Sequence, residues 1–70
     1  MIKEHDIVVL TTQLTNEGFE AGDQGTVVHV HRDGQAYEIE FVALDGNTAV
    51  VLTLDASQVR PVTPGLFHVS

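Results

Sequence analysis

The chain has 70 residues and no cysteine, so its length predicts a single domain and its composition excludes a disulfide framework and a thiolate metal site. Ten acidic residues stand against three lysines and arginines, which gives a net charge of −7 at neutral pH. Proteins that bind nucleic acid place lysine and arginine on the phosphates, so this balance argues against a nucleic-acid partner and favours a basic one.

The first predicted strand is the apolar run at residues 7–10, which follows a polar start. Residues 13–22 are then polar apart from Leu14 and Phe19, and we expect a long loop that these two side chains pin to the domain. A loop of this length in a small domain is often functional. The sequence leaves open whether this one is a binding loop or a structural flap.

Two glycines, Gly22 and Gly25, precede a β-branched run and predict a tight turn that leads into a strongly bent strand at residues 26–31. Asp33-Gly34 follows, a favoured two-residue turn between the strands of a hairpin. This turn predicts a third strand that ends at Phe41.

The hairpin turn also predicts which residues of the two strands lie opposite each other. In this register His29 faces Glu38, and Val28 faces Ile39. Because side chains alternate between the two faces of a strand, a slip of one residue would bury charges. The polar face then holds His29, His31, Glu38 and Glu40. The predicted core consists of Val8, Leu10, Val28, Val30, Tyr37, Ile39, Phe41, Val50, Leu52, Leu54 and Val59.

The last third of the chain predicts two more strands. A turn cluster at residues 44–47 precedes a fourth strand at residues 49–54. Residues 55–58 are too few for a longer helix and predict a single 3₁₀ turn. A short last strand follows at residues 59–62, and Pro61 places it at an edge of the sheet because proline cannot donate to a ladder.

This order of elements is typical of an all-β fold, a small five-stranded Src-homology-3-like (SH3-like) barrel with one 3₁₀ turn before the last strand. The predicted barrel spans residues 1–62. The apolar C-terminal tail, residues 63–70, either folds back over an open end of the barrel or docks on another molecule. The oligomeric state stays open, since Ile7, Val9 or the tail could pair the edges of two chains in a homodimer.

The glycine turn and its strand, residues 22–30, read Gly-Asp-Gln-Gly-Thr-Val-Val-His-Val. They resemble the glycine-centred motif of KOW domains, found in ribosomal proteins and transcription elongation factors, where the second glycine allows a sharp bend. Over residues 5–10, 21–30, 36–41 and 56–62 the chain resembles the bacterial family DUF4926. This resemblance implies a small stand-alone bacterial protein without assigned catalysis, encoded beside a partner in an arrangement like that of toxin and antitoxin.

The polar face of the hairpin is a weak candidate for a metal site. The imidazoles of His29 and His31 and the carboxylates of Glu38 and Glu40 are types of ligand that Zn²⁺ accepts. A solvated face is the simpler interpretation, because histidine beside glutamate is a favourable cross-strand pair. We therefore expect no metal and no cofactor.

No arrangement of residues predicts catalysis. The carboxylates are scattered, the serines have no triad spacing, and the glycine turn lacks the Lys-Ser/Thr ending of a phosphate loop. The charged start lacks the apolar run of a signal peptide, and no stretch is long enough to span a membrane. We therefore expect a soluble, cytoplasmic protein that is not an enzyme.

The expected function is that of an acidic protein-interaction module for a basic partner, with antitoxin-like neutralisation of a basic toxin as its narrower form. The expected binding residues are Glu38 and Glu40 on the sheet face, or Glu17, Glu20 and Asp23 in and beside the long loop. The alternative is a KOW-like nucleic-acid-binding or ribosome-associated domain, which the glycine turn favours and the charge opposes. The negative charge could also serve only solubility.

Overall fold

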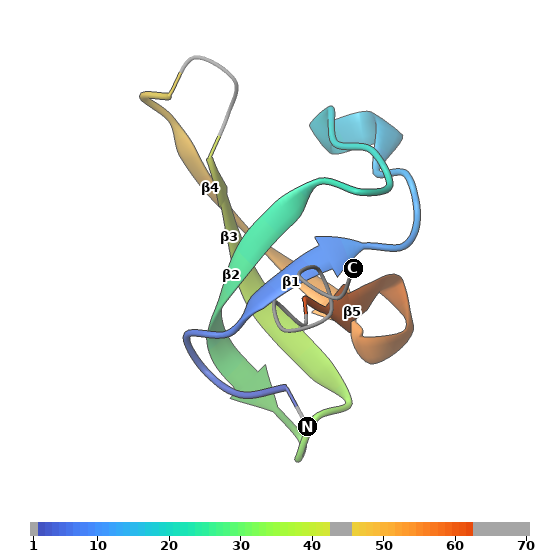
Figure 1. The fold of residues 1–70 in the computed structure, drawn as a ribbon, viewed down its shortest axis with the longest axis vertical. Coiled ribbons are helices and arrows are strands. Elements are labelled where there is room, and N and C mark those ends of the chain that lie inside the picture. Colours follow the sequence, from blue (N-terminus) through green and yellow to red (C-terminus); the bar gives the residue numbers. More distant parts are fainter. Residues whose placement is uncertain (1, 43–45, 63–70) are drawn as a thin grey trace, which may run out of the picture.

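The computed structural model describes residues 2–42 and 46–62, and it shows an antiparallel sheet of five strands (Figure 1). The strands are β1 (Ile7–Leu10), β2 (Gln24–His31), β3 (Ala36–Val42), β4 (Ala49–Asp55) and β5 (Val59–Pro61). Two 3₁₀ turns accompany them, η1 (Thr15–Glu17) between β1 and β2, and η2 (Ala56–Gln58) before β5. The predicted all-β class, the five strands and the 3₁₀ turn before the last strand are confirmed.

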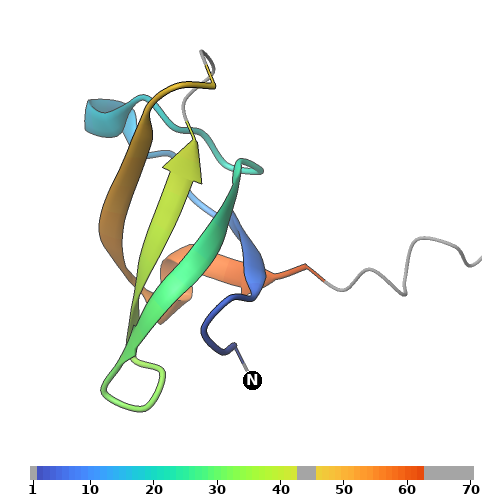
Figure 2. The ribbon, with the colours of Figure 1, turned by 90° about the vertical axis from the view of Figure 1, so that its left-hand side faces the viewer.

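The order of the strands across the sheet is β4-β3-β2-β1-β5. The sheet curls, as Figure 2 shows, but within residues 2–42 and 46–62 no ladder joins β4 to β5, so it is an open barrel. Strand β5 lies at an edge, as Pro61 predicted. Strand β1 does not, because it pairs with β2 on one side and with β5 on the other. The expectation that Ile7 or Val9 offers a free edge is therefore wrong.

The predicted register of the β2–β3 hairpin is right near the turn and wrong beyond it. His29 lies opposite Glu38 as predicted, but Ile39 lies opposite Val27 instead of Val28. The register shifts between Val27 and His29, which is a β-bulge with Val28 as the additional residue. Val27 is fully buried and Val28 is 42% exposed, so Val27 takes the place that was predicted for Val28 in the core.

The bulged register predicts that alanine substitutions of two adjacent valines have different effects on the free energy of unfolding. Val27→Ala removes buried methyl groups, and we expect it to lower the free energy of unfolding by about 2 kcal/mol. Val28→Ala, one residue along at a half-exposed site, should cost less than about 0.5 kcal/mol. Urea denaturation of the two variants measures both, and equal losses would contradict the bulged register.

The turn of this hairpin is also longer than predicted. His31 lies opposite Ala36, so the turn has the four residues 32–35. The φ angles of Arg32, Asp33 and Gly34 are all positive, at 50°, 58° and 99°. Aspartate and glycine tolerate this left-handed region well, but Arg32 gives no such signal in the sequence.

The buried core joins all five strands. It contains Val8, Leu10, Val27, Tyr37, Ile39, Phe41, Leu54 and Val59, and Val30 and Leu52 pack against it from half-buried positions. Of the predicted core side chains, only Val28 is exposed. The alternation that predicted an inward face for β3 and β4 is therefore confirmed.

The loop between β1 and β2 is anchored as predicted. Leu14 and Phe19 form an isolated β-bridge with each other, and both pack on the core. The ring of Phe19 lies 4.8 Å from the ring of Phe41, centroid to centroid, with a tilt of 31°, a favourable aromatic arrangement. The contact holds the η1 loop against the end of β3.

Two predictions fall largely or wholly outside the described residues, namely the turn cluster at residues 44–47 and the tail at residues 63–70. In the part of the chain that the structure describes, no helix has the length and apolarity needed to cross a membrane.

Candidate functional site

A cavity of about 540 Å³ lies where the η1 loop meets the ends of β2 and β3. We call it the acidic loop cavity, and its lining consists of Glu17, Gly18, Phe19, Glu20, Asp23, Gln24, Phe41 and Val42. Phe19, Phe41 and Val42 give the lining an apolar part, and three carboxylates give it negative charge. The three carboxylates predicted as partner-binding residues in and beside the loop therefore line one cavity, namely those of Glu17, Glu20 and Asp23.

Local backbone geometry positions these carboxylates. Gly18 has a φ of 80° and ends η1, a conformation that suits glycine because it has no Cβ. The Asp23 carboxylate accepts the backbone N–H of Glu20 at 2.9 Å, and the backbone N–H of Asp23 donates to the Glu20 carbonyl at 3.0 Å. The turn is tied to β1, since the N–H of Leu10 donates to the Asp23 carbonyl at 2.9 Å. Hydrogen bonds within the turn and to β1 thus hold the segment that carries Glu20 and Asp23.

The carboxylates of the acidic loop cavity form no ion pair with a cationic side chain of the described residues. Across residues 2–42 and 46–62, the ion pairs are those of His29 with Glu4 and of His31 with Glu38. Both pairs lie away from the cavity lining. The negative charge of the cavity therefore faces solvent without a cationic partner from the described part of the chain.

The outer face of the hairpin carries the predicted polar cluster, but the carboxylate of Glu38 is already engaged. The Nε2 atom of His31 lies 2.8 Å from the Oε2 atom of Glu38. The rings of His29 and His31 meet edge to face, with centroids 4.5 Å apart. Glu40 lies one pair further along, opposite Thr26.

The same cluster was the weak candidate for a metal site. Among the described residues, no group of three or more histidine, cysteine, aspartate or glutamate side chains is placed to hold a metal ion. His29 instead faces Glu4, with 3.7 Å between its Nδ1 atom and the carboxylate. Glu4 reaches this face because the N-terminal segment folds back on β2, where the N–H of His5 donates to the carbonyl of Val27 at 2.7 Å. No local pattern in the sequence signals that contact.

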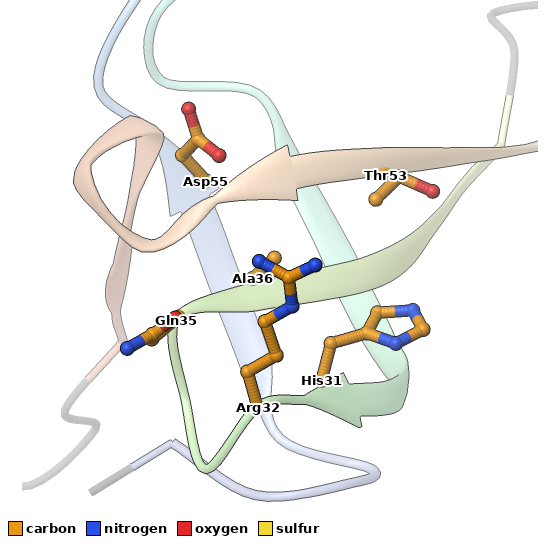
Figure 3. Close-up of a pocket in the computed structure, with 6 residues that line it drawn as sticks. All are labelled: His31, Arg32, Gln35, Ala36, Thr53 and Asp55. Atoms are coloured by element: carbon orange, nitrogen blue, oxygen red, sulfur yellow. The ribbon is translucent and has the colours of Figure 1, made fainter.

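Two further cavities carry charges of both signs. One, of about 380 Å³, lies beside the hairpin turn, and Figure 3 shows the guanidinium of Arg32 directed over β3 towards the β4 side. Its lining consists of His31, Arg32, Gln35, Ala36, Thr53 and Asp55. The other, of about 780 Å³, has Lys3, Glu4 and Asp33 in its lining. Of the three cavities, only the acidic loop cavity is lined by charges of a single sign.

Comparison with known proteins gives one family match. The model of a family described as "Domain of unknown function (DUF4926)" matches residues 4–61. No curated protein and no solved structure matches the chain. The matched range includes all five strands and every residue that lines the acidic loop cavity.

Proposed function

The chain belongs to the DUF4926 family, whose description assigns no activity, and from its geometry we propose that it is a non-catalytic module that binds a basic protein of the bacterial cytoplasm. The observation that carries the proposal is the acidic loop cavity, in which Glu17, Glu20 and Asp23 surround apolar surface without a cationic partner among the described residues. This lining is complementary to a cationic side chain, because it combines negative charge with apolar surface.

Lysine and arginine side chains have an apolar stem and a charged head. In the acidic loop cavity the stem can pack on Phe19 and Val42, while the head reaches the carboxylates. A guanidinium can also lie over an aromatic ring, which adds a cation–π attraction. The cavity therefore suits one arginine or lysine side chain of the partner better than it suits a neutral or acidic one.

The net charge of −7 acts at longer range. It attracts a basic protein before contact and turns polyanions away, and both effects weaken as salt shortens the range of the field. The loop is favoured over the sheet face, because Glu38 on that face is already paired with His31. A non-catalytic role is supported by the cavity lining, which offers carboxylates beside apolar groups but no histidine, lysine or serine.

The narrower form of the proposal is neutralisation of a basic toxin. It predicts that the product of the adjacent gene is harmful when produced alone and harmless when produced with this chain. A harmless neighbour would remove the narrower form and leave the binding module intact.

Affinity capture and gel shift together test the proposed function. The immobilised chain should retain a basic protein from the lysate of its host at low salt and release it as salt rises. RNA and duplex DNA should give no shift under the same conditions. Tight, strongly salt-dependent binding of a nucleic acid would contradict the proposal and support the KOW-like alternative.

A further inference from the structure

The two edges of the sheet differ sharply. Strand β5 has three residues and carries Arg60 and Pro61, which are features that protect an edge against pairing. Strand β4 has seven residues, Ala-Val-Val-Leu-Thr-Leu-Asp, with no proline and no charge before Asp55. In the described part of the chain only β3 pairs with β4, and Figure 2 shows β4 along the margin of the sheet. Within residues 2–42 and 46–62, strand β4 is therefore an edge without the proline and the charge that protect β5.

We propose that the β4 edge pairs with the β4 edge of a second copy of this chain. Two antiparallel strands related by a two-fold axis would join the sheets into one, and such a contact uses the same surface on both copies. Leu52 is the midpoint of Ala49–Asp55, so an axis at Leu52 lets all seven residues pair.

This register is compatible with the sides on which the residues of β4 lie. Residues directly opposite each other in an antiparallel pair lie on the same face. Leu52 then meets Leu52 of the second copy, and Val50 meets Leu54, all on the side of the core. Val51, which is 52% exposed, meets Thr53 on the outer side. Pairing would bury further apolar surface of the half-buried Val50 and Leu52, removing it from contact with water.

The residues of the β4 edge itself place no like charges opposite each other in the proposed pair, although the net charge of −7 on each chain acts against association at long range. In the Leu52 register Asp55 lies opposite Ala49, and the two Asp55 side chains stand at opposite ends of the ladder, roughly 20 Å apart. Two chains of net charge −7 can therefore meet along β4 without facing carboxylates. A basic partner finds no charge on residues 49–54, so this inference is independent of the proposed function.

Sedimentation over a range of concentrations tests the pairing. The interface is a single ladder, so we expect a dimer of twice 7.6 kDa that dissociates on dilution. The variant Val51→Lys/Thr53→Lys places charge on the edge, yet each lysine lies opposite Glu40 or Glu38 of β3, so the fold should persist. We expect its dimer dissociation constant to rise at least about tenfold. A chain that is monomeric at the highest concentration would overturn the proposal.

A matched control separates the edge from the charge change. Ile7→Lys/Val28→Lys adds the same two charges at exposed sites on β1 and β2, and it should leave the dimer unchanged. A dimer that survives the lysines on β4, or that both double variants disrupt equally, would overturn the assignment to this edge. Circular dichroism of each variant confirms that the fold is retained.

The register has its own test, since the chain has no cysteine. Leu52→Cys should form a disulfide-linked dimer on mild oxidation, and Val28→Cys should not. If the lysines on β4 abolish the dimer but Leu52→Cys does not cross-link, the register at Leu52 is wrong. If Val28→Cys cross-links and Leu52→Cys does not, the pairing of the two β4 strands is wrong.

Discussion

Gly25→Ala is expected to lower the free energy of unfolding by about 3 kcal/mol, at the upper end of the usual cost of overpacking. A Cβ atom at position 25 would lie 2.5 Å from Ile39 Cγ2, 2.8 Å from Phe41 Cε1 and 3.0 Å from the carbonyl oxygen of Glu40. Ile39 and Phe41 are buried at the centre of the core and have little room to move. A domain of this size has only a few kcal/mol of stability, so much of the variant should be unfolded at 37 °C.

The control is Gly18→Ala in the η1 loop. A Cβ atom there would meet nothing within 4 Å, so its only cost is the left-handed φ of 80°, about 1 kcal/mol. Urea unfolding followed by circular dichroism compares the two variants. Equal losses would mean that Gly25 is not needed for close packing.

Close packing also accounts for the presence of glycine at position 25, the second glycine of the turn. Gly25 lies opposite Val8 on β1 and is buried, and it is not among the glycines with positive φ. Its role is the close approach of β2 to the side chains of β3. Gly22, by contrast, has a φ of 97° and open space around it, so it supplies the turn.

Removing the three carboxylates of the acidic loop cavity is expected to weaken binding of a basic protein at least about tenfold. Each exposed charge pair contributes about 0.5 kcal/mol, and three such pairs sum to the free-energy change of one factor of ten. The variant is Glu17→Gln/Glu20→Gln/Asp23→Asn, in which asparagine keeps an oxygen for the N–H of Glu20. Titration calorimetry at low salt with the captured basic protein measures the change.

A matched variant separates the cavity from the general field of the molecule. Glu4→Gln/Glu38→Gln/Glu40→Gln also changes the net charge from −7 to −4, but it does so on the face that carries His29 and His31. We expect a loss of less than about threefold, due to long-range attraction alone. Equal losses in the two triple variants would mean that binding depends on net charge and not on the cavity.

The strands could be predicted because their sequences alternate or form short apolar runs, and β3 and β4 are the clearest cases. The bulge could not, because adjacent valines at positions 27 and 28 are equally suited to the core, and only the pairing with Ile39 selects between them. Arg32 likewise gives no sign of its positive φ, which the closure of the hairpin imposes.

The candidate site could be predicted in part. The acidic residues of the loop and the anchoring by Leu14 and Phe19 follow from composition and spacing. The cavity itself depends on the contact of Phe19 with Phe41 at the end of β3, which joins residues far apart in the chain. The pairing of Glu4 with His29 is of the same kind, since it depends on how the N-terminal segment crosses β2.

Nuclear magnetic resonance mapping tests the central claim most directly. The ¹⁵N-labelled chain is titrated at low salt with a short peptide that carries one central arginine, and then with the same peptide carrying glutamate instead. The account predicts that the arginine peptide shifts the amide signals of residues 17–24, 41 and 42, and that the glutamate peptide shifts none of them. Saturating arginine peptide that leaves these signals in place, or that shifts those of His31 and Glu38 instead, would contradict it.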